Sequence, residues 1–129
     1  MISFTSVETS RPILGIQPDR VVILESDLSI RKLLRRLLER RGYLAVEISR
    51  PQELCPIFRD RRADLLVVDV SAGEVNSECV VSLANAHPDL KILALSAEPF
   101  KGTMPGRLLV LPKPFPLEDF VDCVTRLLQ

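Results

Sequence analysis

The sequence has little of the material that metal, redox or membrane chemistry usually requires. It contains one histidine, His87, and three cysteines, Cys55, Cys79 and Cys123, in no metal-type spacing. No apolar run approaches the roughly 18 residues that a membrane span needs, and the first twenty residues do not resemble a signal peptide. No glycine-rich phosphate loop is present. We therefore expect reduced core or surface cysteines, a capping or surface role for His87 and a cytoplasmic location, with no membrane partner.

Charge is balanced overall but unevenly distributed. The formal net charge is zero, yet residues 31–62 hold ten Lys/Arg against four Asp/Glu, whereas residues 63–129 hold five against nine. The basic stretch is either the solvated face of two helices or a docking surface for an acidic partner. A nucleic-acid partner is not expected, because no interleaved aromatics or nucleic-acid module accompany the basic residues.

Short β-branched runs alternate with helical patterns over residues 20–129. Five buried strands are expected at 21–24, 44–48, 65–69, 90–95 and 108–111. Between the first two, apolar residues recur at helical spacing, and Gly42 then fits a helix stop. Three more helices are expected from Pro51, over 77–86 and at the chain end. The inward positions predicted for the first and last helices are Ile30, Leu33, Leu34, Leu37 and Leu38, then Leu117, Phe120, Val121, Val124, Leu127 and Leu128.

This alternation predicts an α/β fold with a doubly wound parallel sheet of five strands. Right-handed crossovers and the element order suit the flavodoxin-like strand order 2-1-3-4-5. The connection over residues 96–107 contains Pro99, Gly102, Pro105 and Gly106, which disfavour a regular helix, so the fourth helix is expected to be shortened or missing. Residues 1–19 show no clear period and are expected to form an N-terminal extension to a domain at 20–129.

Polar side chains follow several of the predicted strands. Glu25 and Asp27 come after the first strand, Asp69 ends the third, Ser96 ends the fourth and Lys113 follows the fifth. Because the carboxyl ends of parallel strands share one edge of the sheet, these side chains should converge there. Clustered carboxylates invite a hard cation such as Mg²⁺, and one of them could then attack a phosphoryl group as a nucleophile. A lysine and a hydroxyl would stabilise the phosphoryl oxygens.

Four segments resemble the motif blocks of response-regulator receiver domains, the phosphoacceptor domains of two-component signalling. The resemblance covers about residues 20–129 in the family's order, and the Lys-Pro-Phe block is its most specific part. The four blocks are Val22-Ile23-Leu24-Glu25-Ser26-Asp27, Leu66-Val67-Val68-Asp69-Val70, Leu93-Ala94-Leu95-Ser96-Ala97 and Leu111-Pro112-Lys113-Pro114-Phe115.

The resemblance implies a role for each matched residue. Asp69 falls on the phosphoacceptor, Ser96 on the hydroxyl that follows the phosphoryl group, and Lys113 on the family's lysine, with a cis bond to Pro114. Glu25, Asp69 and the backbone carbonyl of Ser71 fall on Mg²⁺ ligands, and Asp27 is a candidate to assist through a water molecule.

Several positions depart from the family pattern. Ser26 is neutral where the family usually has a second metal-binding acid, so a lowered Mg²⁺ affinity is expected. Gly73, Ser77 and Val110 stand where the family commonly has proline, glycine and an aromatic residue. With the expected loss of the fourth helix, these changes affect the signalling surface more than the phosphate pocket.

Two functions from different classes therefore remain open. The first is a phosphorelay receiver that takes a phosphoryl group on Asp69 from a histidine kinase or phosphotransfer protein. It would act through contacts with an unknown downstream protein, without catalysing an output reaction of its own. By resemblance, the partner would dock on the basic first helix, which carries Arg31, Lys32, Arg35 and Arg36. The second is a phosphorylation-independent, pseudo-receiver interaction module. A flavodoxin-like enzyme or cofactor binder is a third and weaker alternative.

Overall fold

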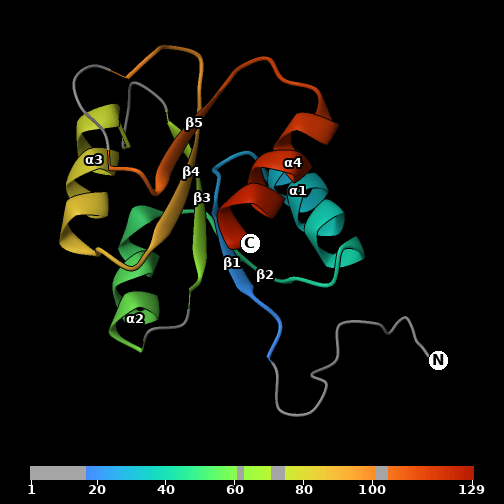
Figure 1. Cartoon of the computed structure of the whole chain (residues 1–129), viewed down its shortest axis with the longest axis horizontal. Helices are drawn as coiled ribbons and strands as arrows, with labels where there is room; N and C mark the ends of the chain where they lie inside the picture. The colour runs from blue at the N-terminus through green and yellow to red at the C-terminus, as the bar shows by residue number, and fades with distance from the viewer. Residues whose placement is uncertain (1–16, 61–62, 71–74, 101–104) are drawn as a thin grey trace.

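A computed structural model describes residues 17–60, 63–70, 75–100 and 105–129. Five strands form one parallel sheet in the order β2-β1-β3-β4-β5, which confirms the predicted topology. Figure 1 shows α1 and α4 on one side of this sheet and α2 and α3 on the other. The elements run β1 (Arg20–Leu24), α1 (Leu28–Arg40), β2 (Leu44–Ile48), a 3-10 turn (Pro51–Glu53), α2 (Leu54–Arg59), β3 (Leu65–Val70), α3 (Ser77–Ala86), β4 (Lys91–Ser96), β5 (Leu108–Pro112) and α4 (Leu117–Leu128).

Local signals in the sequence explain where the helices begin and end. The Asp27 carboxylate accepts a hydrogen bond from the Ile30 amide at 3.0 Å, which caps the first turn of α1. Gly42 has a φ of +88°, a left-handed conformation that follows the helix end and favours glycine. Asn76 caps α3 in the same way as Asp27, through the Cys79 amide at 2.9 Å.

The sheet is buried on both faces. Alternate residues of the central strands point to opposite sides, so β1 contributes Val21 and Ile23 to the core under α1 and α4. Its other residues, Val22 and Leu24, pack toward α2 and α3. This two-sided burial explains why the strands are continuous apolar runs rather than alternating ones.

The predicted inward faces of the first and last helices are partly wrong. Leu34 and Leu38 of α1 are buried, but Ile30 and Leu33 are 44% and 41% exposed, and Leu117 of α4 is 42% exposed. The buried positions lie in later turns of each helix, where the chain packs against the sheet. Ile30 and Leu117 lie in the first turn of their helices, before that contact, whereas Leu33 directly precedes the buried Leu34 and points about 100° away from it around the helix.

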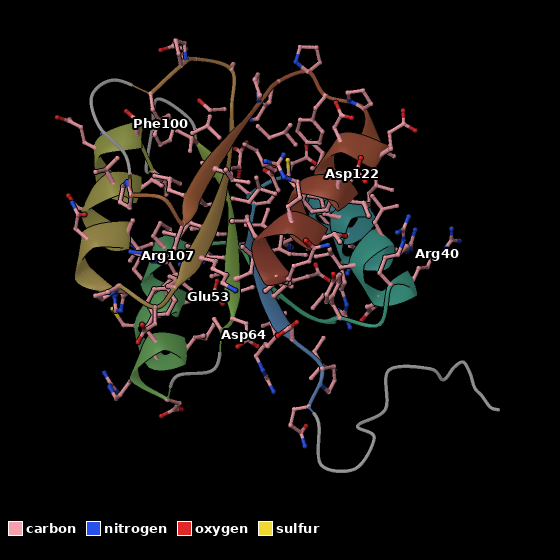
Figure 2. The ribbon with its side chains drawn as sticks, in the orientation of Figure 1. Arg40, Glu53, Asp64, Phe100, Arg107 and Asp122 are labelled. Atoms are coloured by element: carbon pink, nitrogen blue, oxygen red, sulfur yellow. The ribbon has the colours of Figure 1, made fainter. Side chains whose placement is uncertain are left out.

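The connection between β4 and β5 contains no helix in its described residues, 97–100 and 105–107. Phe100, labelled in Figure 2, packs with Val110 against the core on the α2 and α3 side. The expected extension over residues 1–19 lies outside the described residues except for 17–19. No described helix has the length and apolar character to cross a membrane.

Candidate functional site at the carboxyl edge of the sheet

Strand ends bring four of the predicted residues to one edge. In the parallel register, Asp69 of β3 pairs with Leu95 of β4, and Val70 pairs with Ser96. Ser96 in turn pairs with Pro112, the last residue of β5, so Lys113 follows directly at the same edge. Glu25 follows the end of β1, which is paired with β3. The parallel topology thus places Glu25, Asp69, Ser96 and Lys113 at the ends of adjacent strands.

The Lys113 ammonium contacts the Asp69 carboxylate directly. Lys113 Nζ donates a hydrogen bond to Asp69 Oδ1 as part of an ion pair. The side chain of Asp69 is 14% exposed and that of Lys113 is 35% exposed, so the pair is reachable from solvent. The Lys113 amide also donates to the Ser96 carbonyl at 2.9 Å, which ties the lysine segment to the end of β4. The Lys113–Pro114 bond is cis, as the resemblance implied.

Glu25 is a buried carboxylic acid beside this ion pair. It is only 5% exposed, and its Oε2 accepts a hydrogen bond from the Asp27 amide at 3.0 Å. Burial raises the pKa of Glu25, the Asp27 amide opposes that effect, and the nearby negative charge of Asp69 raises the pKa further. A bound cation at this edge would relieve both the burial cost and the repulsion between the two carboxylates.

Asp27 and Ser26 differ from a paired acidic motif. The Asp27 side chain is exposed and its Oδ1 is used to cap α1. Ser26 is exposed and carries no charge. Within the described ranges, no group of three or more His, Cys, Asp and Glu side chains is arranged to hold a metal ion. Ser71, whose carbonyl was predicted as a further ligand, lies outside the described residues.

The Ser96 hydroxyl is engaged with its own loop. Ser96 is 4% exposed, and its Oγ donates to the Glu98 carbonyl at 2.7 Å and accepts from the Glu98 amide at 3.2 Å. A pocket of about 200 Å³ lies beside it. This pocket is lined by Val70, Asn76, Ser77, Ser96, Ala97, Glu98 and Pro99.

A second charged cluster, which the sequence did not reveal, joins α1 to β2. Glu47 accepts hydrogen bonds from Arg31 Nε at 3.0 Å and Arg35 Nη1 at 2.9 Å, and Lys32 Nζ lies 3.5 Å from it. These contacts, chiefly the one with Arg35, lower the pKa of Glu47 to about 2. In the sequence, the signal for this cluster was a single acid, Glu47, within a short apolar strand, together with the bases Arg31, Lys32 and Arg35 on the preceding predicted helix.

We expect Glu47→Gln to destabilise the protein by about 2 kcal/mol at neutral pH. The pKa of Glu47 is about 2 in the folded state against an ordinary 4.5, so its stabilisation is complete above pH 4.5 and is lost as pH falls toward 2. Urea unfolding of both proteins at pH 7, 5 and 3 checks this. The difference should be equal at pH 7 and 5 and about half as large at pH 3. A difference that does not depend on pH would contradict the assignment.

Comparisons with known proteins agree with this architecture. No protein-family model matches the chain. The response regulator MprA of Mycobacterium sp. (strain KMS) is 32% identical over 119 residues, which cover 87% of this chain. The match covers 51% of MprA, so the chain spans about half the length of this relative.

Solved structures show the same fold. The receiver domain of the hybrid histidine kinase CckA aligns with a TM-score of 0.70 at 23% identity, covering 85% of this chain and 99% of that one. The response regulator TrrA of Thermotoga maritima, solved with Mg²⁺ and BeF, aligns with a TM-score of 0.71 at 20% identity, covering 84% and 98%. The sequence relatives, this fold and the converging motif residues agree: the chain has the fold of response-regulator receiver domains and is similar in sequence to response regulators.

Proposed function

We propose that the chain accepts a phosphoryl group on Asp69 within a two-component phosphorelay. The observation that carries the proposal is the contact between Lys113 and Asp69 at the carboxyl edge of the sheet, beside the buried Glu25. A carboxylate oxygen of Asp69 would attack the phosphorus of a phosphohistidine. The P–O bond of an acyl phosphate would form as the P–N bond breaks, and the histidine nitrogen would leave with the bonding electrons. Lys113 would offset the negative charge of the phosphoryl oxygens.

Mg²⁺ is the cofactor that this donor set fits. Glu25 and Asp69 supply two carboxylates, and Mg²⁺ in proteins is commonly held by one or two carboxylates with water in its other positions. We propose these two residues as ligands, with the Ser71 carbonyl as a third and Asp27 acting through water. When bound, the ion would neutralise charge on the phosphoryl oxygens. The neutral Ser26 supports a weak affinity.

Ser96 is proposed to report the phosphorylated state. Its hydroxyl is held by two hydrogen bonds to the Glu98 backbone. A phosphoryl group on Asp69 would offer a charged acceptor, and charge-assisted hydrogen bonds are stronger than neutral ones. The hydroxyl would then leave Glu98, and the residues that follow β4 would move. Because no helix forms in the described part of this connection, we propose the loop itself as the surface that a downstream protein reads.

The proposed phosphodonor is a histidine kinase or a phosphotransfer protein, which would place the chain in the cytoplasm. TrrA, one of the structural neighbours, was solved in complex with the histidine kinase ThkA. In this chain, Arg31 and Arg35 of the first helix are held by Glu47, so they contribute less free charge than the sequence suggested. Three large apolar residues, Leu28, Ile30 and Leu33, are also exposed in the first turns of α1. We therefore propose a mainly apolar docking contact there, bordered by Lys32 and Arg36.

The docking proposal predicts that replacing both Ile30 and Leu33 by alanine slows phosphotransfer from a partner. Each side chain is over 40% exposed, so folding should change little, whereas the loss of two apolar contacts should slow transfer about tenfold. Arg40→Ala is the matched control, because Arg40 lies in the last turn of α1 and points away from the molecule (Figure 2). Transfer rates from a phosphorylated histidine kinase would be compared with rates from a small-molecule donor. Equal slowing with both donors would argue against docking.

Intact mass after incubation with a small-molecule phosphodonor tests the proposed function. We expect a phosphoryl adduct on the wild type that increases with Mg²⁺ and is absent from Asp69→Asn. The asparagine variant keeps the size of the side chain but lacks the nucleophilic oxygen. Folded wild-type protein that forms no adduct even at high Mg²⁺ would overturn the proposal.

A second candidate is an interaction module that works without phosphorylation. Ser26 favours it, because the described residues offer two converging carboxylates instead of the family's three acids. The experiment above separates the two functions, since this module would form no adduct but would still bind its partner. In either case we propose a signalling domain at residues 20–129, with residues 1–19 as an extension, rather than an enzyme with its own output reaction.

A further inference from the structure

Arg31 links the candidate site to the edge of the sheet. Its side chain lies in α1 and is 13% exposed. Nη1 donates a hydrogen bond to the backbone carbonyl of Glu25 at 2.8 Å, and Nε donates to Glu47 Oε1 at 3.0 Å. A single planar guanidinium thus spans the end of β1 and the neighbouring strand β2.

The carbonyl that Arg31 contacts belongs to the buried acid of the site. β1 ends at Leu24, so the Glu25 carbonyl lies beyond the last paired residue of that strand. The amide of Glu25 is held by the Ile48 carbonyl of β2 at 3.3 Å, and Arg31 supplies the donor on the other side. A buried carbonyl without a donor would cost free energy, so this contact constrains the backbone of Glu25.

The backbone that follows Glu25 also contacts the Glu25 carboxylate. That carboxylate accepts from the Asp27 amide two residues later, so the turn from Glu25 to Asp27 and the carboxylate form one unit. Arg31 holds this unit through its hydrogen bond to the Glu25 carbonyl, and Glu47 in turn fixes the Arg31 guanidinium. A shift in the Arg31 contact would therefore move the Glu25 oxygens relative to Asp69.

We propose that Arg31 is a positioning residue for the phosphoacceptor site, where it holds the Glu25 backbone so that the carboxylate is aimed at the edge beside Asp69. The role rests on the Mg²⁺ site of the proposed function, because it matters through the ion that Glu25 and Asp69 would share. Lysine cannot replace arginine here. It keeps the charge but lacks the rigid fork that reaches a carbonyl and a carboxylate in two fixed directions.

Arg35 provides a matched control within the same cluster. It also donates to Glu47, at 2.9 Å, and its other side-chain hydrogen bond goes to Glu39. Arg35→Lys therefore disturbs the same ion-pair cluster without touching the Glu25 carbonyl. A purely structural role of the cluster would make the lysine variants at 31 and 35 behave alike.

The test measures Mg²⁺ affinity by calorimetric or NMR titration of the wild type, Arg31→Lys, Arg31→Gln and Arg35→Lys. Thermal unfolding of each protein is recorded in parallel. We expect both Arg31 variants to bind Mg²⁺ about tenfold more weakly, the lower end of what loss of a ligand-orienting contact costs, and Arg35→Lys to stay within about twofold. Phosphoryl adduct formation at subsaturating Mg²⁺ should fall in the same order.

The outcomes separate this inference from the proposed function. Equal Mg²⁺ affinity for the variants at 31 and 35, on a wild type that forms the adduct, would remove the Arg31 role and leave the phosphoacceptor intact. A wild type that binds Mg²⁺ but forms no adduct would overturn the proposed function, while the affinity difference would still support Arg31 as a positioning residue. A wild type that binds no Mg²⁺ would overturn the Arg31 role.

Discussion

Ser26→Asp is expected to strengthen Mg²⁺ binding at least about tenfold. Ser26 is exposed and directly follows the buried Glu25, so the new carboxylate would stand at the entrance to the site. Opposite unit charges about 4 Å apart attract by roughly 4 kcal/mol near a protein surface, and repulsion from Glu25 and Asp69 offsets part of this. A remaining gain of about 1.4 kcal/mol corresponds to tenfold in affinity.

The control for this change is Ser29→Asp. Ser29 is also exposed and lies in the first turn of α1, so the substitution adds the same charge without placing it beside Glu25. Mg²⁺ titrations of the three proteins, each followed by phosphodonor treatment and intact mass, give the comparison. Adduct formation by Ser26→Asp should saturate at lower Mg²⁺ than the wild type. If the wild type binds Mg²⁺ as tightly as Ser26→Asp does, the neutral residue at 26 does not weaken the site.

The sheet was predictable because each strand carries its own local signal. Val21 to Leu24 and Leu65 to Val68 are continuous apolar runs, which suit strands buried on both faces, and helical spacing separates them. The strand ends then followed from the topology, since parallel strands bring Asp69 and Lys113 to one edge. The local apolar pattern and the order of the elements were therefore sufficient to predict the sheet and the placement of Asp69 and Lys113 at its edge.

The sequence was less informative about burial and side-chain contacts, because these depend on how the folded elements pack. Ile30 and Leu33 have the spacing of buried residues, but spacing shows neither where along the helix the contact with the sheet begins nor how wide the buried face is. The sequence left open whether the bases of α1 are a solvated face or a docking surface, and it did not show that Arg31 and Arg35 pair with Glu47. Ser96 lies at the predicted edge of the sheet, and the two hydrogen bonds of its hydroxyl to the Glu98 backbone are a local detail that residue spacing does not reveal.

Phe120→Ala is expected to lower the free energy of unfolding by about 3–5 kcal/mol. Phe120 is fully buried in α4, in the core that α1 and α4 form with the sheet. Its removal leaves a cavity that the surrounding strands cannot fill. Small domains have only about 5–15 kcal/mol of stability, so much of the population could unfold. Leu117→Ala, one turn earlier and 42% exposed, should cost less than about 0.5 kcal/mol.

Substitution of Phe120 should also affect the candidate site, in addition to the stability of the core. The Phe120 ring stacks on Phe115 with centroids 6.3 Å apart, and Phe115 lies two residues after Lys113. Urea unfolding of Phe120→Ala, the milder Phe120→Leu and Leu117→Ala gives the stability series, with Phe120→Leu expected to lose about 1–2 kcal/mol and remain folded. Phosphodonor labelling of folded Phe120→Leu should be slower than that of Leu117→Ala, because the segment that presents Lys113 to Asp69 has lost its aromatic support. Equal labelling of the two folded variants would show that Lys113 is held by its own contacts with Asp69 and Ser96 alone.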